Sequence, residues 1–213
     1  MSWRAAVSII DRLGAVKTVI AELAAAPGPD ELATAAVAQR AANLIRPSGA
    51  FERLDRVAAW LAGWQRTDIP EVVKPGLVLA AADHGVAARD VSVDPRNLTV
   101  ATVDAIRAGV ATSAILCANL GASLRLLDVG VGEPTADLMV EDAMGPERFL
   151  RAFAEGREAV ATMDIDLLLL GGLGVGGTTA AAAVALGLFG GAGEEWVGSG
   201  SSSRDGYRSD LMI

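Results

Sequence analysis

The sequence predicts an α/β fold: a three-layer, mostly parallel, Rossmann-like sheet with an N-terminal helical region. Two short apolar runs, residues 76–82 and 123–129, are typical of buried strands, and a third run at 167–170 leads into glycines. Segments of helical character lie between these runs. Because strands that alternate with helices indicate parallel pairing and right-handed crossovers, we expect helices on both faces of the sheet.

Residues 1–70 are expected to form a helical lead-in that serves as a small domain or in dimerisation. Residues 5–26 are rich in strong helix formers and are followed by Pro-Gly-Pro. Asp30 can cap a second helix that runs toward Ile45 and is stopped by Pro47. A third helix after Gly49 has one apolar face with helical spacing, formed by Leu54, Val57, Ala58 and Leu61.

Residues 71–200 are expected to form an α/β nucleotide-binding core, and residues 201–213 a divergent tail. The first strand, 76–82, ends in the polar loop Asp83-His84-Gly85. A single helix is predicted from about Thr99 to Leu120, closed by Gly121. Another helix begins at Pro146, carries Phe149 and Phe153 on one face, and leads to the third, buried strand.

The most distinctive feature is the run from Asp164 to Leu186, where an apolar strand passes into glycines and then into an alanine-rich helix. Glycine has no side chain to keep a ligand away, and backbone N–H groups at a helix start favour an anion. We therefore predict a ligand that carries a phosphate. The predicted phosphate- and ribose-binding residues are Gly172, Gly174, Val175, Gly176, Gly177 and Thr178. The alternative is that these glycines only let the helix pack closely on the sheet.

Two other phosphate-binding patterns fit less well. The spacing of Gly172, Gly174 and Gly177 matches G-x-G-x-x-G, with Glu194 at the distance of the acidic partner, but no strand precedes that glutamate. The lysine of a P-loop is missing after Gly177. A dinucleotide-dependent oxidoreductase stays open as a weaker alternative.

Polar residues after the first two strands are expected to border the same crevice. In a parallel sheet ligands bind beyond the carboxyl ends of the strands, which places Asp83, His84 and Asp128 near the glycine loop. His84 could contact a ligand or hold its loop by hydrogen bonding, and Asp83 is expected to organise the loop as an acceptor. The residue spacing indicates no metal site and identifies no catalytic residue, and no cofactor is expected.

Composition excludes several classes of partner. The chain has 213 residues, 52% of them hydrophobic, a net charge of −8 and a pI near 4.7, so nucleic acid is not an expected partner. The lone Cys117 is expected to be a packed thiol in a reducing, cytoplasmic setting. Residues 167–193 lack charge over a length that could cross a bilayer, but nine of them are glycine, and no membrane insertion is expected.

An ordered set of motifs resembles the nicotinate-nucleotide:dimethylbenzimidazole phosphoribosyltransferase family. The likeness extends from about Ile45 to Gly200, and the motifs are residues 46–55, 81–87, 93–99, 127–131, 172–182 and 195–198. The resemblance implies transfer of phosphoribose from nicotinate mononucleotide to dimethylbenzimidazole, which yields α-ribazole phosphate and nicotinate for the lower ligand of cobalamin. It also implies a homodimer without a metal, and a base pocket that contains Asp83, His84, Asp94 and Thr102.

The chain departs from that family at several positions. The family has Glu where Gly172 stands, Asn where Gly177 stands, serine where Asp94 stands and glutamine where Thr102 stands. The family also continues beyond the position of Ile213 to a glutamate that acts as general base. We therefore expect a truncated form or a fragment that is weakly active or inactive alone. The alternative is a non-catalytic nucleotide-binding protein or a companion subunit that forms a heterodimer with a complete paralogue.

Overall fold

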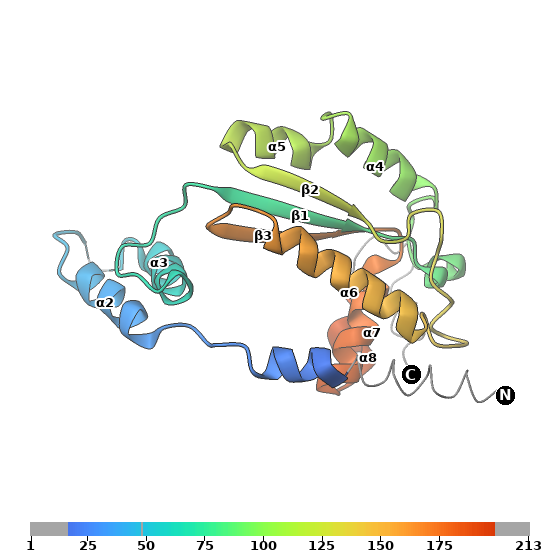
Figure 1. Cartoon of the computed structure of the whole chain (residues 1–213), viewed down its shortest axis with the longest axis horizontal. Coiled ribbons are helices and arrows are strands. Elements are labelled where there is room, and N and C mark those ends of the chain that lie inside the picture. Colours follow the sequence, from blue (N-terminus) through green and yellow to red (C-terminus); the bar gives the residue numbers. More distant parts are fainter. Residues whose placement is uncertain (1–16, 48, 199–213) are drawn as a thin grey trace. The chain divides into compact units, whose positions relative to one another are not determined.

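A computed structural model describes residues 17–47 and 49–198, and Figure 1 shows their helices and strands. The chain divides into two compact units. Of the described residues, one unit contains those up to Lys74 together with Ile165–Leu167, and the other contains Pro75–Asp164 and residues 168–198. The predicted tail at 201–213 and the first part of the predicted helix at 5–26 lie outside the described residues. The predicted domain boundary after residue 70 stays a prediction.

The first unit is built on the helices α2 (Glu31–Ala42) and α3 (Glu52–Gln65), preceded by a helical segment at residues 17–24. Asp30 caps α2 as predicted, since its Oδ1 accepts the N–H groups of Leu32 at 2.9 Å and Ala33 at 3.1 Å. The helix ends at Ala42, earlier than the predicted Ile45. Its contact with α3 is made by the small buried side chains Ala33, Val37 and Ala62.

The second unit contains a three-stranded parallel sheet in the order β2-β1-β3. Its strands are β1 (Pro75–Ala81), β2 (Ser123–Asp128) and β3 (Leu167–Leu173). β1 and β2 run in register from Gly76 opposite Ser123 to Ala81 opposite Asp128. The α/β class and the positions of the first two strands are thus confirmed, and the strands end at the same edge of the sheet.

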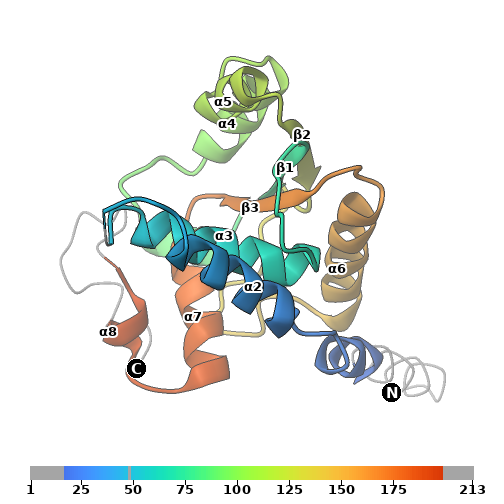
Figure 2. The same cartoon turned by 90° about the vertical axis from the view of Figure 1, so that its left-hand side faces the viewer.

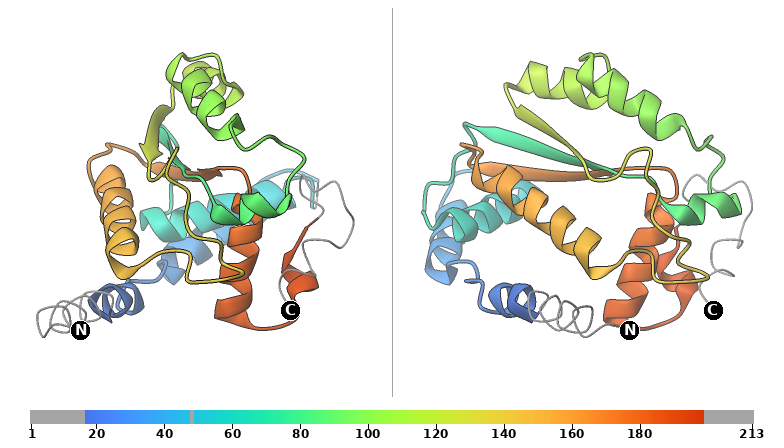
Figure 3. Two further views of the ribbon diagram at one scale, coloured as in Figure 1. Left: turned by 90° about the vertical axis from the view of Figure 1, so that its right-hand side faces the viewer. Right: turned by 45° about the vertical axis from the view of Figure 1, so that its right-hand side comes forward.

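Helices cover both faces of this sheet, which gives the three layers that the sequence predicts (Figures 1 and 3). α4 (Leu98–Arg107) and α5 (Thr112–Leu120) lie on one face, and α6 (Pro146–Ala161) and α7 (Gly177–Phe189) lie on the other. A 3-10 helix, η1 (Gly85–Arg89), follows β1, and α8 (Gly193–Trp196) follows α7. Buried side chains come mainly from β1, α4 and the segment after β1: Val78, Ala81, Val86, Val91, Val103 and Ile106.

The single helix predicted from Thr99 to Leu120 is wrong, because α4 and α5 are separate. Gly109 takes a left-handed φ of +75°, and the N–H groups of Gly109 and Val110 bond back to the carbonyls of Ile106 and Ala105. This glycine-ended pattern closes a helix. By length and composition, Leu98–Leu120 is the one described stretch apolar enough to cross a membrane, but its backbone is broken at this turn.

The third strand differs from its prediction in length and in burial. β3 extends through Gly171 and Gly172 to Leu173, so these two glycines belong to the strand and the turn contains only 174–176. β3 lies at the edge of the described sheet, and Leu169 and Leu170 are 44% and 74% exposed. The apolar run predicted a strand correctly, but strand side chains are buried only where other elements cover the faces of the sheet, and the described residues leave Leu169 and Leu170 uncovered.

Candidate functional site

A hollow of about 750 Å³ lies at the carboxyl ends of β1 and β3 in the second unit. Its lining comes from the ends of those strands, the first two turns of α7, one face of α6 and the loop between β2 and α6. Most of this surface is apolar. The polar or charged side chains among the described lining residues are His84, Thr135, Arg148 and Thr178. Figure 2 shows α6 and α7 on the same side of the sheet.

The end of β1 is held by hydrogen bonds to the loop that follows β2. Asp83 Oδ2 accepts the Gly132 N–H at 2.8 Å, its carbonyl accepts the Thr135 N–H at 3.1 Å, and its own N–H donates to the Gly130 carbonyl at 3.1 Å. Asp83 therefore organises the loop, as predicted from its position after a strand. Its neighbour His84 lines the hollow, whereas Asp83 is not among the lining residues.

The end of β3 is shaped by glycines that allow close approach of the two strand ends. A Cβ at Gly174 would overlap the Ala82 carbonyl oxygen, and a Cβ at Gly177 would lie 3.3 Å from His84 Nε2. The histidine ring thus sits against the first residue of α7. A side chain at Gly174 would collide with backbone, so this glycine has a packing role here whatever it binds.

Some of the backbone N–H groups that were predicted to bind phosphate are already hydrogen-bonded within the protein. The Val175 N–H donates to Thr99 Oγ1 at 3.2 Å, and the Gly177 N–H donates to the Gly174 carbonyl at 3.0 Å. Gly176 takes a left-handed φ of +83° and is buried against η1. A Cβ at Gly176 would lie 3.3 Å from the backbone nitrogen of Ala87. The predicted phosphate- and ribose-binding residues that line the hollow are Gly172, Gly174, Gly177 and Thr178.

Arg148 is the only cation among the described lining residues. It lies in the first turn of α6 and donates to the carbonyls of Pro134, at 3.0 Å, and Glu133. These two bonds direct the guanidinium toward the loop beside the hollow. The sequence patterns did not single out Arg148, although its spacing of four from Ala152, which lines the same hollow, could have indicated a shared helix face.

His84 and Arg148 are the titratable groups of the described lining, and their surroundings keep the histidine neutral. Burial lowers the pKa of His84 below its ordinary 6.5, the nearby carboxylate of Asp83 raises it, and Arg148 lowers it further. Desolvation is the larger effect. The hollow therefore presents one positive charge and a neutral ring at neutral pH, which suits an anionic ligand.

Several predicted site residues lie away from this hollow. Thr102 donates to the Leu98 carbonyl of its own helix at 2.8 Å, and the Asp94 N–H donates to Ser92 Oγ at 3.2 Å in a local turn. Neither residue lines the hollow, nor do Val175 and Gly176. Of the ten predicted residues, the structure brings five together here: His84, Gly172, Gly174, Gly177 and Thr178.

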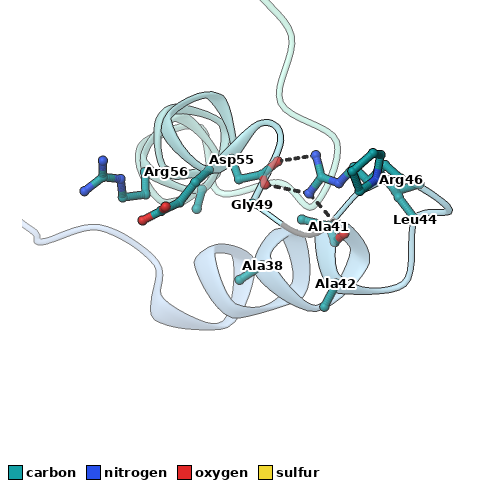
Figure 4. A pocket seen from close by; sticks show the side chains of 11 residues that line it. Ala38, Ala41, Ala42, Leu44, Arg46, Gly49, Asp55 and Arg56 are labelled. Atoms are coloured by element: carbon teal, nitrogen blue, oxygen red, sulfur yellow. Dashed lines mark hydrogen bonds and ion pairs between the residues drawn. The ribbon is translucent and has the colours of Figure 1, made fainter.

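A second hollow, of about 570 Å³, lies between α2 and α3 in the first unit (Figure 4). Small alanines form much of its lining, and Arg46 bridges it by donating to both carboxylate oxygens of Asp55, at 2.9 and 2.5 Å, and to the Ala41 carbonyl. Since the carboxylate of Asp55 neutralises the charge of this guanidinium, the pair has a structural role. Among the described residues, no group of three or more His, Cys, Asp or Glu side chains could hold a metal.

Comparison with known proteins gives one consistent result. The profile of a family described as phosphoribosyltransferase matches residues 26–209. The chain is 42% identical to a nicotinate-nucleotide:dimethylbenzimidazole phosphoribosyltransferase from Cereibacter sphaeroides and 38% identical to one from Brucella anthropi. Each match covers 83% of this chain and 52% of the relative. The crystal structure of CobT from Thermus thermophilus superposes with a TM-score of 0.76 at 33% identity, covering 84% of this chain and 60% of that one.

Proposed function

Because the chain belongs to the nicotinate-nucleotide:dimethylbenzimidazole phosphoribosyltransferase family, we propose that its hollow binds a nicotinate nucleotide and an aromatic base. The chain spans about half the length of the curated relatives it matches. The observation that carries the proposal is the hollow itself. One cation and a helix start bordered by glycines lie within an otherwise apolar lining, next to the ends of two parallel strands.

The charges and surfaces of the hollow match the two parts of the substrate pair. Arg148 supplies the cation for the anionic groups of the nucleotide, and the start of α7 adds the positive end of a helix dipole. Gly172, Gly174, Gly177 and Thr178 leave room for ribose and phosphate at that helix start. The apolar residues of the loop and of α7 suit a flat dimethylbenzimidazole ring.

The reaction proposed for this site transfers phosphoribose between two nitrogen atoms. The unprotonated ring nitrogen of dimethylbenzimidazole attacks the ribose C1′, and the bond from C1′ to the nicotinate nitrogen breaks with its electron pair. The other ring nitrogen of the base then gives up its proton. Proximity within the hollow can supply much of the rate enhancement, but a proton acceptor is also needed.

The described lining lacks a proton acceptor of suitable strength. It contains no carboxylate, and the lowered pKa of His84 makes that ring a poor base. We therefore propose that this chain binds the nucleotide and turns it over slowly by itself. The same observation favours a second candidate, a non-catalytic nucleotide-binding protein or companion subunit of a complete paralogue.

Calorimetry with nicotinate mononucleotide and with nicotinate riboside, which lacks the phosphate, tests the proposal. We expect binding of the nucleotide and at least tenfold weaker binding of the riboside. Arg148→Met should weaken nucleotide binding by about 2 kcal/mol, roughly thirtyfold in Kd, because a charged hydrogen-bond donor is lost. Arg151→Met is the matched control, since Arg151 is an exposed arginine of the same helix. Equal affinities for the two ligands would reject the phosphate site.

An assay of nicotinate release separates the two candidates. The phosphoribosyltransferase proposal expects slow release of nicotinate that depends on added dimethylbenzimidazole. The companion-subunit proposal expects nucleotide binding without release, and release that accelerates when a complete paralogue is added. Absence of any phosphate-dependent binding would eliminate both.

We also propose that the protein is cytoplasmic and forms a homodimer, or a heterodimer with a paralogue, through the first unit. A stripe of large apolar side chains on α3 supports this: Leu54, Val57, Trp60 and Trp64 are between 49% and 63% exposed. Their spacing places them on one side of the helix, and exposed apolar stripes of this kind mark interaction surfaces. Light scattering should give a dimer mass for the wild type and a monomer mass for Trp60→Glu.

A further inference from the structure

One wall of the hollow is a loop without regular secondary structure, residues 129–145, between β2 and α6. Val129 lines the hollow at the start of this loop, and its second half contributes the apolar wall of Leu138, Ala143 and Met144. A loop has no ladder of backbone bonds to fix it, so the position of this wall depends on individual ties to neighbouring elements. Those ties decide how much room the hollow offers to a flat ring.

The first half of the loop is tied to the segment after β1 by backbone groups. Gly132 and Thr135 donate their N–H groups to Asp83, and the Gly85 N–H donates to Thr135 Oγ1 at 3.2 Å. A Cβ at Gly85 would overlap the carbonyls of Thr135 and Ala136, so the two segments are in direct contact there. The contacts with the segment after β1 end at Ala136. Its N–H donates to the Ala143 carbonyl at 2.9 Å, which closes the segment that carries the apolar wall but does not tie that segment to a neighbouring element.

The second half of the loop is tied by an ion pair. Arg89, the last residue of η1, places its Nε 2.6 Å from Asp137 Oδ2. The other carboxylate oxygen of Asp137 accepts the Met139 N–H at 3.1 Å, and its carbonyl accepts the Val140 N–H at 2.9 Å. Asp137 thus organises the turn that carries Leu138 and anchors that turn to η1 at the same time.

The surroundings keep this carboxylate charged. Desolvation raises the pKa of Asp137, but the hydrogen bond from Met139 and the adjacent Arg89 guanidinium together outweigh it and leave the pKa below its ordinary value. The side chains of Arg89 and Asp137 are 36% and 24% exposed. A partly exposed ion pair of this kind stabilises by about 1 kcal/mol or less, at most about fivefold in an equilibrium constant.

We propose that Arg89 and Asp137 are a positioning pair that holds the Leu138–Met144 wall against the hollow and thereby selects the aromatic base that fits. This inference rests on the proposed function for the identity of the ligand. Neither residue lines the hollow, so both act through the wall and not by touching the base. The pair should affect the aromatic base more than the nucleotide. Arg148 lies on α6 and bonds to the first half of the loop, at Glu133 and Pro134, and the start of α7 belongs to another element.

Hydrogen exchange of the free protein tests the positioning role directly. In Arg89→Met we expect faster exchange of the amides of residues 136–144, with little change at 83–85 and 130–135. Arg89→Lys keeps the charge and should restore part of the protection. The matched control is Arg40→Met, which removes an exposed arginine of α2 in the first unit. Equal exchange in Arg89→Met and Arg40→Met would overturn the proposal.

Calorimetry with dimethylbenzimidazole and with a naphthimidazole, which has one more fused ring, tests the selective role. We expect Arg89→Met to raise the Kd for dimethylbenzimidazole about fivefold, the effect of a partly exposed ion pair. The ratio of the Kd for the naphthimidazole to the Kd for dimethylbenzimidazole should become smaller than in the wild type. The Kd for nicotinate mononucleotide should stay within about twofold. An unchanged preference between the two bases would overturn the selective role. Failure of the wild type to bind any of these ligands would instead reject the proposed function, while the exchange result would still decide the positioning role.

Discussion

β1 and β3 run side by side to the same site, yet the two strands reach it by different means. β1 lies between two neighbours, and its buried residues Gly76, Val78 and Ala81 belong to the core. It ends at Ala81 and is followed by Asp83, whose carboxylate accepts the Gly132 N–H, and by His84, whose ring lines the hollow. β3 lies at the edge of the described sheet, exposes Leu169 and Leu170, and ends in glycines. Side chains position one end of the site, and the absence of side chains positions the other.

This difference teaches that the glycine motif combines two tasks. Gly174 allows the contact with the Ala82 carbonyl, whereas Gly172 has nothing within 4 Å of a Cβ built on it. Both line the same hollow. A glycine needed for packing and a glycine that leaves room for a ligand can therefore be told apart by substitution.

The largest effect is expected at Gly174. Gly174→Ala places a methyl group against backbone that cannot move aside and should destabilise the protein by about 3 kcal/mol. Gly172→Ala is the matched control and should change the free energy of unfolding by less than about 1 kcal/mol, because alanine suits a strand better than glycine does. Urea denaturation measures both. Similar losses in the two variants would remove the distinction between the two glycines.

The contrast in burial between the strands predicts the next effect. Val78→Ala deletes two methyl groups at a β1 position that is 4% exposed and should cost about 2 kcal/mol. Leu170→Ala, at a β3 position that is 74% exposed, should stay within about 0.5 kcal/mol. Thermal unfolding monitored by circular dichroism compares them. A loss at Leu170 as large as that at Val78 would mean that β3 is covered in solution.

A smaller effect is expected where the glycine turn is tied to α4. Thr99 is 1% exposed and its Oγ1 accepts the Val175 N–H, so Thr99→Val leaves that buried donor unpaired at a cost of about 1.5 kcal/mol. The control is Thr102→Val on the same helix, where the hydroxyl donates to the Leu98 carbonyl one turn earlier. That change should cost less than about 0.5 kcal/mol. Equal costs would show that the tie to Val175 contributes nothing.

The smallest effect concerns the end of β1 and depends on pH. The pKa of His84 is lowered in the folded protein and is near 6.5 in the unfolded chain. At a pH between these two pKa values the unfolded chain binds more protons than the folded protein. The contribution of neutral His84 to stability is therefore fully present above about pH 6.5 and is lost as the pH falls toward the folded-state pKa. His84 is the only histidine of the chain. His84→Gln should therefore flatten the dependence of the urea midpoint between pH 7 and 5, and an unchanged slope would contradict the assignment.

Patterns within single segments predicted much of this architecture. The apolar runs located the strands, Asp30 located a helix start, and the position after a strand identified the role of Asp83. The stacked rings of Phe149 and Phe153, 6.3 Å apart, follow from their spacing on a helix.

Features that depend on tertiary neighbours escaped prediction. In the sequence, Gly109 looks like an ordinary position within an apolar helix. Only the folded backbone, with its hydrogen bonds, has the left-handed turn there. The exposure of β3 depends on which elements cover its two faces. Arg148 lines the hollow and the Arg89–Asp137 pair lies on the loop beside it, from segments whose sequences carry no binding motif, so only the folded chain brings them there.

Hydrogen exchange with and without nicotinate mononucleotide tests the central claim most directly. If the nucleotide binds between the glycine end of β3 and the first turn of α6, added nucleotide should slow exchange at residues 172–178 and 145–149. The hairpin of α2 and α3, which contains the second hollow, should be unaffected. Protection confined to that hairpin, or no protection anywhere at saturating nucleotide, would contradict this account of the site.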